Sequence, residues 1–231
     1  MKTRTLTSIL TLLALVVVLA PSGAQAAGSE GGGTISGAPS APARTPDQMA
    51  LDYFNRGLSL RNKAWKFEAK AEAADGAQRI KLEGKMMAQF KKAATSYGKA
   101  IEKNPNLYQA HTSLGYALRR QGDYAAALVA YDRALELNPN YPEALEYRAE
   151  AYLGLDRAED ARESYSTLLV VDPARAEELI VAFGKWVEAK KSDANGIDVQ
   201  DIEKIGKWVD SRRAVATVTA PAAEAAGRSW R

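Results

Sequence analysis

An internal period of 34 residues constrains the fold of this chain more than any other feature of its sequence. Three Asn-Pro or Asp-Pro dipeptides stand at this spacing: Asn104-Pro105, Asn138-Pro139 and Asp172-Pro173. Before each dipeptide, at matching offsets, come a small residue, a tyrosine and a small or apolar residue: Ala93, Tyr97 and Ala100; Ala127, Tyr131 and Ala134; Ala161, Tyr165 and Leu168. Such a period is typical of stacked helix pairs, which bury their apolar faces only against neighbouring pairs.

The central copy, residues 108–141, shows how the two helices of one pair could approach each other. Gly115 and Ala127 are small enough to lie where the two helix backbones come close. Gly122 can adopt the left-handed conformation that ends the first helix, and Asp123 can cap the second. The sequence therefore predicts two helices joined by a short turn at Gly122.

These positions, together with Ala110 and Leu114, make the central copy resemble a tetratricopeptide repeat. The resemblance covers roughly residues 48–175 and implies an all-α fold, a right-handed α-solenoid of helix-turn-helix repeats. It also implies an interaction scaffold rather than an enzyme, with an inner groove lined by the first helix of each repeat. We expect the second full copy to span residues 142–175, where Arg148 and Ala149 replace the Leu-Gly pair of the central copy.

The N-terminus has the pattern of a secretory signal peptide. Lys2 and Arg4 precede an apolar run from residue 6 to residue 20, and Ala24-Gln25-Ala26 fits a cleavage site. The run is shorter than the roughly 20 residues that a spanning helix needs, although an uncleaved anchor is the alternative. We expect residues 1–26 to be removed and the protein to be exported, to the periplasm in a two-membrane bacterium. The mature chain is then expected to contain no transmembrane helix.

The segment that follows the predicted signal peptide should be a linker. Residues 27–46 are rich in Gly, Ser, Ala and Pro and have few bulky side chains. Such a segment buries too little apolar surface to offset its chain entropy, so we expect a flexible linker.

The first repeat, residues 47–107, is longer than the others. Gly57 takes the place that Gly115 holds in the central copy, but the matching tyrosine, Tyr97, arrives 24 residues late. Apolar residues keep helical spacing on both sides of an Asp75-Gly76 turn signal. We therefore predict a long helical hairpin that projects about 18 Å beyond its neighbours.

The hairpin is basic, because residues 61–92 contain nine Lys or Arg and four Asp or Glu. One interpretation is a solvated hairpin that its lysines keep soluble. The other is a contact with an acidic partner or an anionic envelope surface, either lipid or cell-wall polymer.

Beyond the repeats, two further segments are distinguished by their patterns. Residues 176–213 carry apolar residues at helical spacing, which predicts C-terminal capping helices that close the core. Residues 214–231 are rich in alanine and lack a pattern, so we expect a disordered tail.

The resemblance implies which residues face the groove. In the acidic second full copy, Glu143, Glu146 and Glu150 are spaced i, i+3 and i+7 and share one helix face. They could form a solvated face, or an acidic strip that receives a Lys- or Arg-containing segment. By alignment of the copies, the candidate partner-binding residues are Asn55, Leu58, Gln109, Thr112, Tyr116, Arg119, Glu143, Glu146, Tyr147 and Glu150.

Composition narrows the chemistry further. The chain has no cysteine and one histidine, His111, which the resemblance places toward the core of its own repeat. We therefore predict no metal site and no cofactor, and we find no catalytic motif. The net charge of +3 falls to about +1 without Lys2 and Arg4, which argues against a nucleic-acid partner.

Two functions follow from these patterns. The first is a non-catalytic scaffold that binds a protein or peptide segment in its groove. The alternative is a cell-envelope surface or structural protein that uses the basic hairpin.

Overall fold

The computed structural model describes the backbone of residues 43–228 and the side chains of residues 43–214. The predicted signal peptide and residues 27–42 of the predicted linker lie outside the described residues. All regular secondary structure in the described part is α-helical. The eight helices are α1 (Pro46–Glu72), α2 (Gly76–Lys103), α3 (Tyr108–Arg119), α4 (Tyr124–Leu137), α5 (Pro142–Gly154), α6 (Ala158–Val171), α7 (Pro173–Ser192) and α8 (Val199–Arg228).

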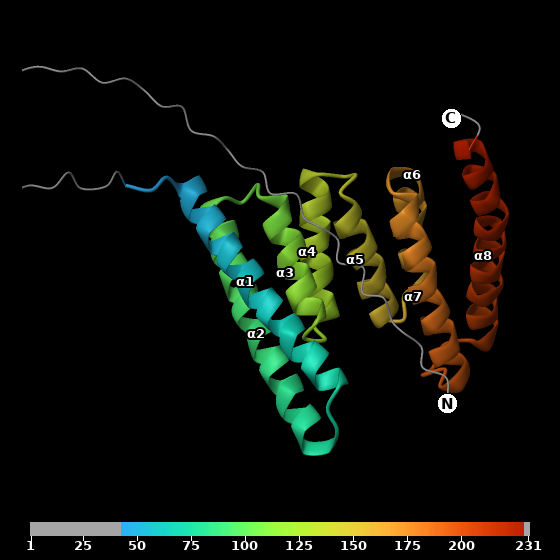
Figure 1. The fold of residues 1–231 in the computed structure, drawn as a ribbon, viewed down its shortest axis with the longest axis horizontal. Helices are drawn as coiled ribbons and strands as arrows, with labels where there is room; N and C mark the ends of the chain where they lie inside the picture. Colours follow the sequence, from blue (N-terminus) through green and yellow to red (C-terminus); the bar gives the residue numbers. More distant parts are fainter. Residues whose placement is uncertain (1–42, 229–231) are drawn as a thin grey trace, which may run out of the picture. The chain divides into compact units, whose positions relative to one another are not determined.

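The helices of residues 43–228 follow one another side by side in chain order (Figure 1). Each helix packs against the next one in sequence, from α1 against α2 to α7 against α8. In addition, α3 contacts α5 and α5 contacts α7, so the first helices of successive pairs lie close together. This arrangement confirms the predicted all-α solenoid, and the first helices form its inner wall.

Each of the first two helix pairs is closed by a tyrosine ring that lies directly on a glycine. A Cβ atom added to Gly115 would lie 2.5 Å from Cε1 of Tyr131, and one added to Gly57 would lie still closer to Tyr97. Both tyrosines are fully buried. The two glycine–tyrosine contacts are equivalent although their sequence separations differ by 24 residues. The insertion therefore lengthens both helices of the first pair and leaves their packing unchanged at this contact.

The lengthened helices form the predicted hairpin. Helices α1 and α2 contain 27 and 28 residues, whereas α3 and α4 contain 12 and 14. Figure 1 shows the closed end of the hairpin extending beyond the ends of α3 and α4. The chain reverses at Gly76, whose φ of 51° lies in the left-handed region that favours glycine.

The turns follow the predicted chemistry. Gly122 has a φ of 82°, and the Asp123 side chain accepts a hydrogen bond of 3.1 Å from the backbone N–H of Ala126. At the start of α1, Thr45 forms a capping box with Gln48. These contacts satisfy backbone groups that the helix ends leave without partners.

The third pair modifies the tyrosine contact. Ala149 stands in the place of Gly115, and its Cβ prevents a ring from lying directly on the backbone. Tyr165 packs edge-on against Phe183 of α7 and Trp208 of α8, with ring centroids 6.4 and 5.0 Å apart. Through this contact the core of the repeats continues into the last two helices.

Helices α7 and α8 close the core, as expected for the predicted capping helices. Their buried residues join one hydrophobic cluster with residues of α5 and α6. Helix α8 continues to Arg228, into the segment where the sequence predicts a disordered tail. Alanine has the highest intrinsic helix propensity, so an alanine-rich segment can continue a helix without an apolar pattern. No helix among the described residues is both long and apolar enough to span a membrane.

We predict that Gly115→Ala lowers the free energy of unfolding by about 1–3 kcal/mol, because the new methyl group overlaps the Tyr131 ring. Gly98→Ala is the matched control, since a Cβ atom there meets nothing within 4 Å. This second change should stabilise the helix by about 0.5–1 kcal/mol. Urea denaturation monitored by circular dichroism measures both effects, and equal stabilities for the two variants would contradict the close-packing interpretation.

Candidate partner-binding face

Helices α3 and α5 bring the central candidate residues together on the inner wall. The rings of Tyr116 and Tyr147 lie 5.2 Å apart between centroids. The Arg119 guanidinium lies 5.4 Å from each ring centroid and forms an ion pair of 2.7 Å with Glu150. We use "inner-face site" for Tyr116, Arg119, Glu143, Glu146, Tyr147 and Glu150.

The acidic strip of the inner-face site is engaged by an arginine from the next helix pair. Arg175 of α7 lies 3.1 Å from Glu143 and 2.6 Å from Glu146, measured between nitrogen and oxygen atoms. Asp172 contacts the same guanidinium at 3.3 Å. The glutamates are therefore not a freely solvated face, since Arg175 and Arg119 hold all three. The repeat pattern does not reveal Arg175, because the 34-residue period ends just before it.

Negative charge still exceeds positive charge at this end of the site. Four carboxylates pair with the two guanidinium groups of Arg119 and Arg175, and the charge of Glu178 also acts on this cluster; the four are Glu143, Glu146, Glu150 and Asp172. Burial raises the pKa of Glu146 above its ordinary value, and the charges of Glu150 and Glu178 raise it further, although Arg175 opposes them. The Glu146 side chain is only 13% exposed. Its charge is thus held in an unfavourable environment that one arginine does not fully offset.

The remaining candidates do not join this site. Thr112 is buried and its hydroxyl donates to the Tyr108 carbonyl at 3.1 Å, which is a contact within its own helix. Leu58 packs into the hydrophobic cluster at the base of the hairpin. Asn55 is exposed on α1, and Gln109 is half-buried near the start of α3. Thr112 and Leu58 are thus engaged within the repeats, whereas no hydrogen bond, ion pair or ring contact among the described residues joins Asn55 or Gln109 to the inner-face site.

Tyr116 also connects the inner-face site to the hairpin. Its hydroxyl accepts hydrogen bonds from Trp65 Nε1 at 2.8 Å and from Arg120 at 3.1 Å. Arg120 pairs with Glu68 of α1, and Arg61 stacks over the Trp65 ring at 4.2 Å. The repeat pattern does not reveal this network, because Trp65 and Glu68 lie in the inserted segment, which has no counterpart in the other repeats.

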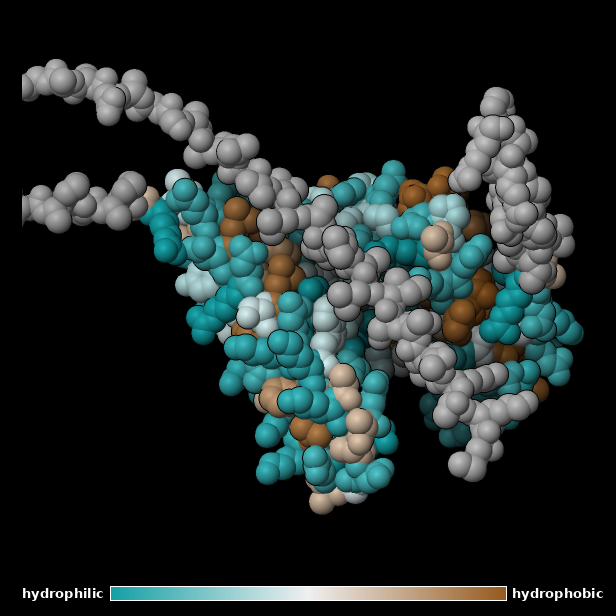
Figure 2. Space-filling model, in the orientation of Figure 1, coloured by the Kyte–Doolittle hydropathy of each residue, from teal (hydrophilic) through white to brown (hydrophobic). Residues whose placement is uncertain are grey.

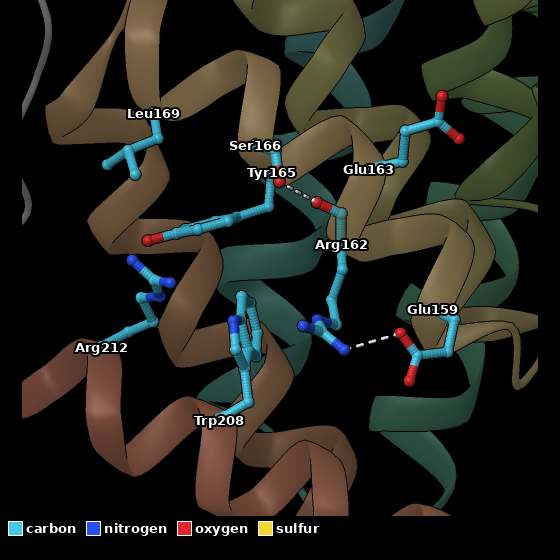
Figure 3. Close-up of a pocket in the computed structure, with 8 residues that line it drawn as sticks. All are labelled: Glu159, Arg162, Glu163, Tyr165, Ser166, Leu169, Trp208 and Arg212. Carbon is cyan, nitrogen blue, oxygen red and sulfur yellow. Dashed lines mark hydrogen bonds and ion pairs between the residues drawn. The ribbon is translucent and has the colours of Figure 1, made fainter.

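Apart from the inner-face site, a hollow lies between α6 and α8 (Figure 3). It encloses about 370 Å³ and is lined by Glu159, Arg162, Glu163, Tyr165, Ser166, Leu169, Trp208 and Arg212. Arg162 lies 4.9 Å from the Trp208 ring centroid and pairs with Glu159 at 2.7 Å. Two arginines and two glutamates balance each other here, so this hollow offers less charge selectivity than the inner-face site.

The described residues contain no group of three or more His, Asp or Glu side chains placed to hold a metal ion. His111 is buried, and its Nε2 lies 2.9 Å from the carbonyl oxygen of Pro105. This contact places the ring in the core of its repeat.

Comparisons with known proteins identify the repeats. No curated protein sequence matches the chain. Two family models described as tetratricopeptide repeat match residues 108–141 and residues 130–163. The first match coincides with the central copy, and the second overlaps it in a different frame.

Several solved structures are similar to the chain. The first TPR domain of human RPAP3 is 22% identical, and the match covers 64% of this chain and 98% of that one with a TM-score of 0.47. The first TPR of Spaghetti (RPAP3), bound to the HSP90 peptide SRMEEVD, is 21% identical. The match covers 55% of this chain and 93% of that one with a TM-score of 0.41. MamA, known from a crystal structure, is 18% identical. The match covers 71% of this chain and 96% of that one with a TM-score of 0.39. The family models therefore show that residues 108–163 of this chain are similar to tetratricopeptide repeats.

Proposed function

We propose that this protein is a non-catalytic scaffold that binds a segment of a partner protein at the inner-face site. Tetratricopeptide repeats generally serve protein interaction, which supports the general function. The observation that carries the specific proposal is the excess of carboxylates around Arg175, next to two half-buried tyrosines.

The chemistry of the site favours a segment that contains Lys or Arg. Tyrosines provide apolar area together with a hydroxyl that tolerates water, which suits a surface that alternates between free and bound states. The surplus negative charge would attract a basic segment and select its orientation. Arg119 and Arg175 hold the carboxylates in fixed positions before the partner arrives, which lowers the entropy that binding must overcome.

The cost of keeping Glu146 ionised also supports a functional role. Burying an ion pair often contributes nothing to stability, because desolvation offsets the attraction between the charges. A carboxylate that burial destabilises is therefore better explained by recognition than by folding. Titratable groups whose pKa is shifted by burial and by neighbouring charges are often found at functional sites.

We further propose that the protein is exported and works outside the cytoplasm. The support is the sequence pattern of residues 1–26: basic residues, an apolar run and a small-residue cleavage site.

The first prediction concerns the pH dependence of stability. A raised pKa in the folded state means that the folded protein holds the Glu146 proton more tightly than the unfolded chain does. The contribution of Glu146 to stability is therefore fully present below its unfolded-state pKa of 4.5. It is lost as the pH rises through its folded-state pKa. Glu146→Gln should remove this loss and raise the free energy of unfolding at neutral pH, because the neutral amide does not carry the charge that burial disfavours.

Chemical denaturation at a series of pH values measures this effect. Glu136→Gln is the control, since Glu136 forms an exposed surface pair with Arg133 and should contribute little at any pH. A Glu146 variant that is less stable than the parent at neutral pH would show that the carboxylate serves folding.

The second prediction concerns binding. On an array of extended synthetic peptides, the protein should retain peptides that contain Lys or Arg in preference to neutral or acidic ones. The combined change of Glu143→Gln and Glu146→Gln should weaken this retention at least about tenfold, since charged contacts of this kind are worth about 1.5–3 kcal/mol each.

The matched control for binding is Glu159→Gln with Glu163→Gln, which removes the same charge from the hollow between α6 and α8. This variant should bind like the parent. A preference for acidic peptides, or equal losses in both double variants, would contradict recognition at the inner-face site.

The third prediction concerns export. When the full chain is expressed in a two-membrane bacterium, mass spectrometry of the periplasmic fraction should find a mature N-terminus at Ala27. Replacing Leu12 and Val16 by Arg interrupts the apolar run and should leave an uncleaved chain in the cytoplasm. Cleavage and export of that variant, or an intact parent N-terminus, would disprove the assignment.

A further inference from the structure

The face of the hairpin that points away from α3 carries two rows of cations. On α2, five exposed lysines fall within an arc of about 40°, because their spacings of four and seven residues are close to whole turns of a helix. On α1, three exposed cations follow one another at intervals of seven residues. We use "basic end face" for Arg56, Lys63, Lys70, Lys81, Lys85, Lys92, Lys99 and Lys103.

Ring contacts place both rows on one side of the hairpin. Lys85 lies 5.7 Å from the Phe67 ring centroid, and Lys99 lies 5.7 Å from that of Tyr53. Phe67 and Tyr53 precede Lys70 and Arg56 by three residues each, so they lie on the same side of α1 as these cations. The rows are therefore neighbours, separated by a seam of half-buried apolar residues.

The opposite side of α2 faces the repeats. Phe90 packs on Tyr116 of α3 with ring centroids 5.9 Å apart, and it is two residues from Lys92. Residues two positions apart in an α-helix point in directions that differ by about 200°, so Lys92 points away from α3. In Figure 1 the hairpin forms one end of the row of helices, and no later helix covers this side. The basic end face is thus the free end of the solenoid.

The positive charge of this face is not neutralised within the described part of the chain. None of its eight cations forms an ion pair with a carboxylate there, whereas Glu68 and Glu83 of the hairpin are paired with Arg120 and Arg79. Asp52, at the edge of the face, is paired with Arg44. The α2 row runs over 23 residues, from Lys81 to Lys103, or about 33 Å. Figure 2 shows hydrophilic residues over most of the hairpin in the view drawn.

We propose that the basic end face adsorbs to an anionic lipid bilayer through its headgroups. Two parallel rows form a strip of charge, and a flat array of headgroups can meet both rows at once. Clusters of four to eight Lys or Arg on a helical surface are typical of binding to anionic lipids. This proposal is independent of the inner-face site, which lies on the other side of the hairpin.

The contact is one of adsorption rather than insertion. The large hydrophobic side chains that are exposed in the structure, such as Trp65 and Ile80, do not belong to the two rows. Tyr53 and Phe67 lie half-buried beneath lysines, whose ammonium groups stay at the surface. Binding should therefore weaken steeply as salt is added, because the screening length falls below about 10 Å above 0.1 M ionic strength.

Cosedimentation of the full chain with vesicles tests this proposal. Vesicles of phosphatidylcholine alone are compared with vesicles that also contain phosphatidylglycerol, so that any contribution of the apolar N-terminal run appears in both. We expect salt-sensitive binding that requires phosphatidylglycerol. The triple change of Lys63→Glu, Lys81→Glu and Lys92→Glu should weaken it by about a hundredfold, since each lysine near an anionic surface contributes about a factor of five.

The matched control carries the same charge change at the other end of the solenoid: Lys185→Glu, Lys191→Glu and Lys207→Glu. It should keep the phosphatidylglycerol-dependent binding, and circular dichroism should show parental helix content for both triple variants. Equal losses in both would attribute binding to net charge and overturn the proposal. Parental binding by the first triple variant would overturn it too, as would capture by immobilised heparin without any binding to the anionic vesicles.

Discussion

The fold depends on close contact between a tyrosine ring of one helix and a glycine of the neighbouring helix. At Gly57 and Gly115 the absence of a Cβ atom lets the ring of Tyr97 or Tyr131 fill the space between two helices. One rigid, fully buried ring then fills a space that would otherwise need several small side chains. Because the contact recurs at matching positions in the first two pairs, these pairs present similar surfaces to one another, while the third pair continues the stack through Tyr165 and its aromatic neighbours.

The same contact explains how the first pair tolerates a long insertion. Added turns lie beyond the glycine–tyrosine contact, so they lengthen the helices without altering the stack below. The inserted segment is then connected back to the repeats by polar contacts of Tyr116 with Trp65 and of Arg120 with Glu68. Tyr116 thus belongs to two structures at once, the base of the hairpin and the inner-face site.

Most of the fold could be predicted from the sequence, because repeated spacing fixes neighbours as well as helices. Gly57 and Tyr97 revealed the lengthened pair, and Gly122 with Asp123 revealed a turn. The site was less accessible to sequence reasoning. Helical spacing correctly grouped Glu143, Glu146 and Glu150 on one face, but their partner Arg175 follows the last periodic proline. Spacing also cannot show that a cation from the next helix will occupy an acidic face.

The hairpin's outer charge has a consequence for how copies of this protein can associate. Solenoids are open-ended, and an uncovered terminal pair could in principle accept the end of another molecule and begin a fibre. Eight cations without carboxylate partners among the described residues make direct pairing of two such ends unfavourable, since two like-charged ends repel when they approach. Association of two copies hairpin to hairpin is thereby discouraged.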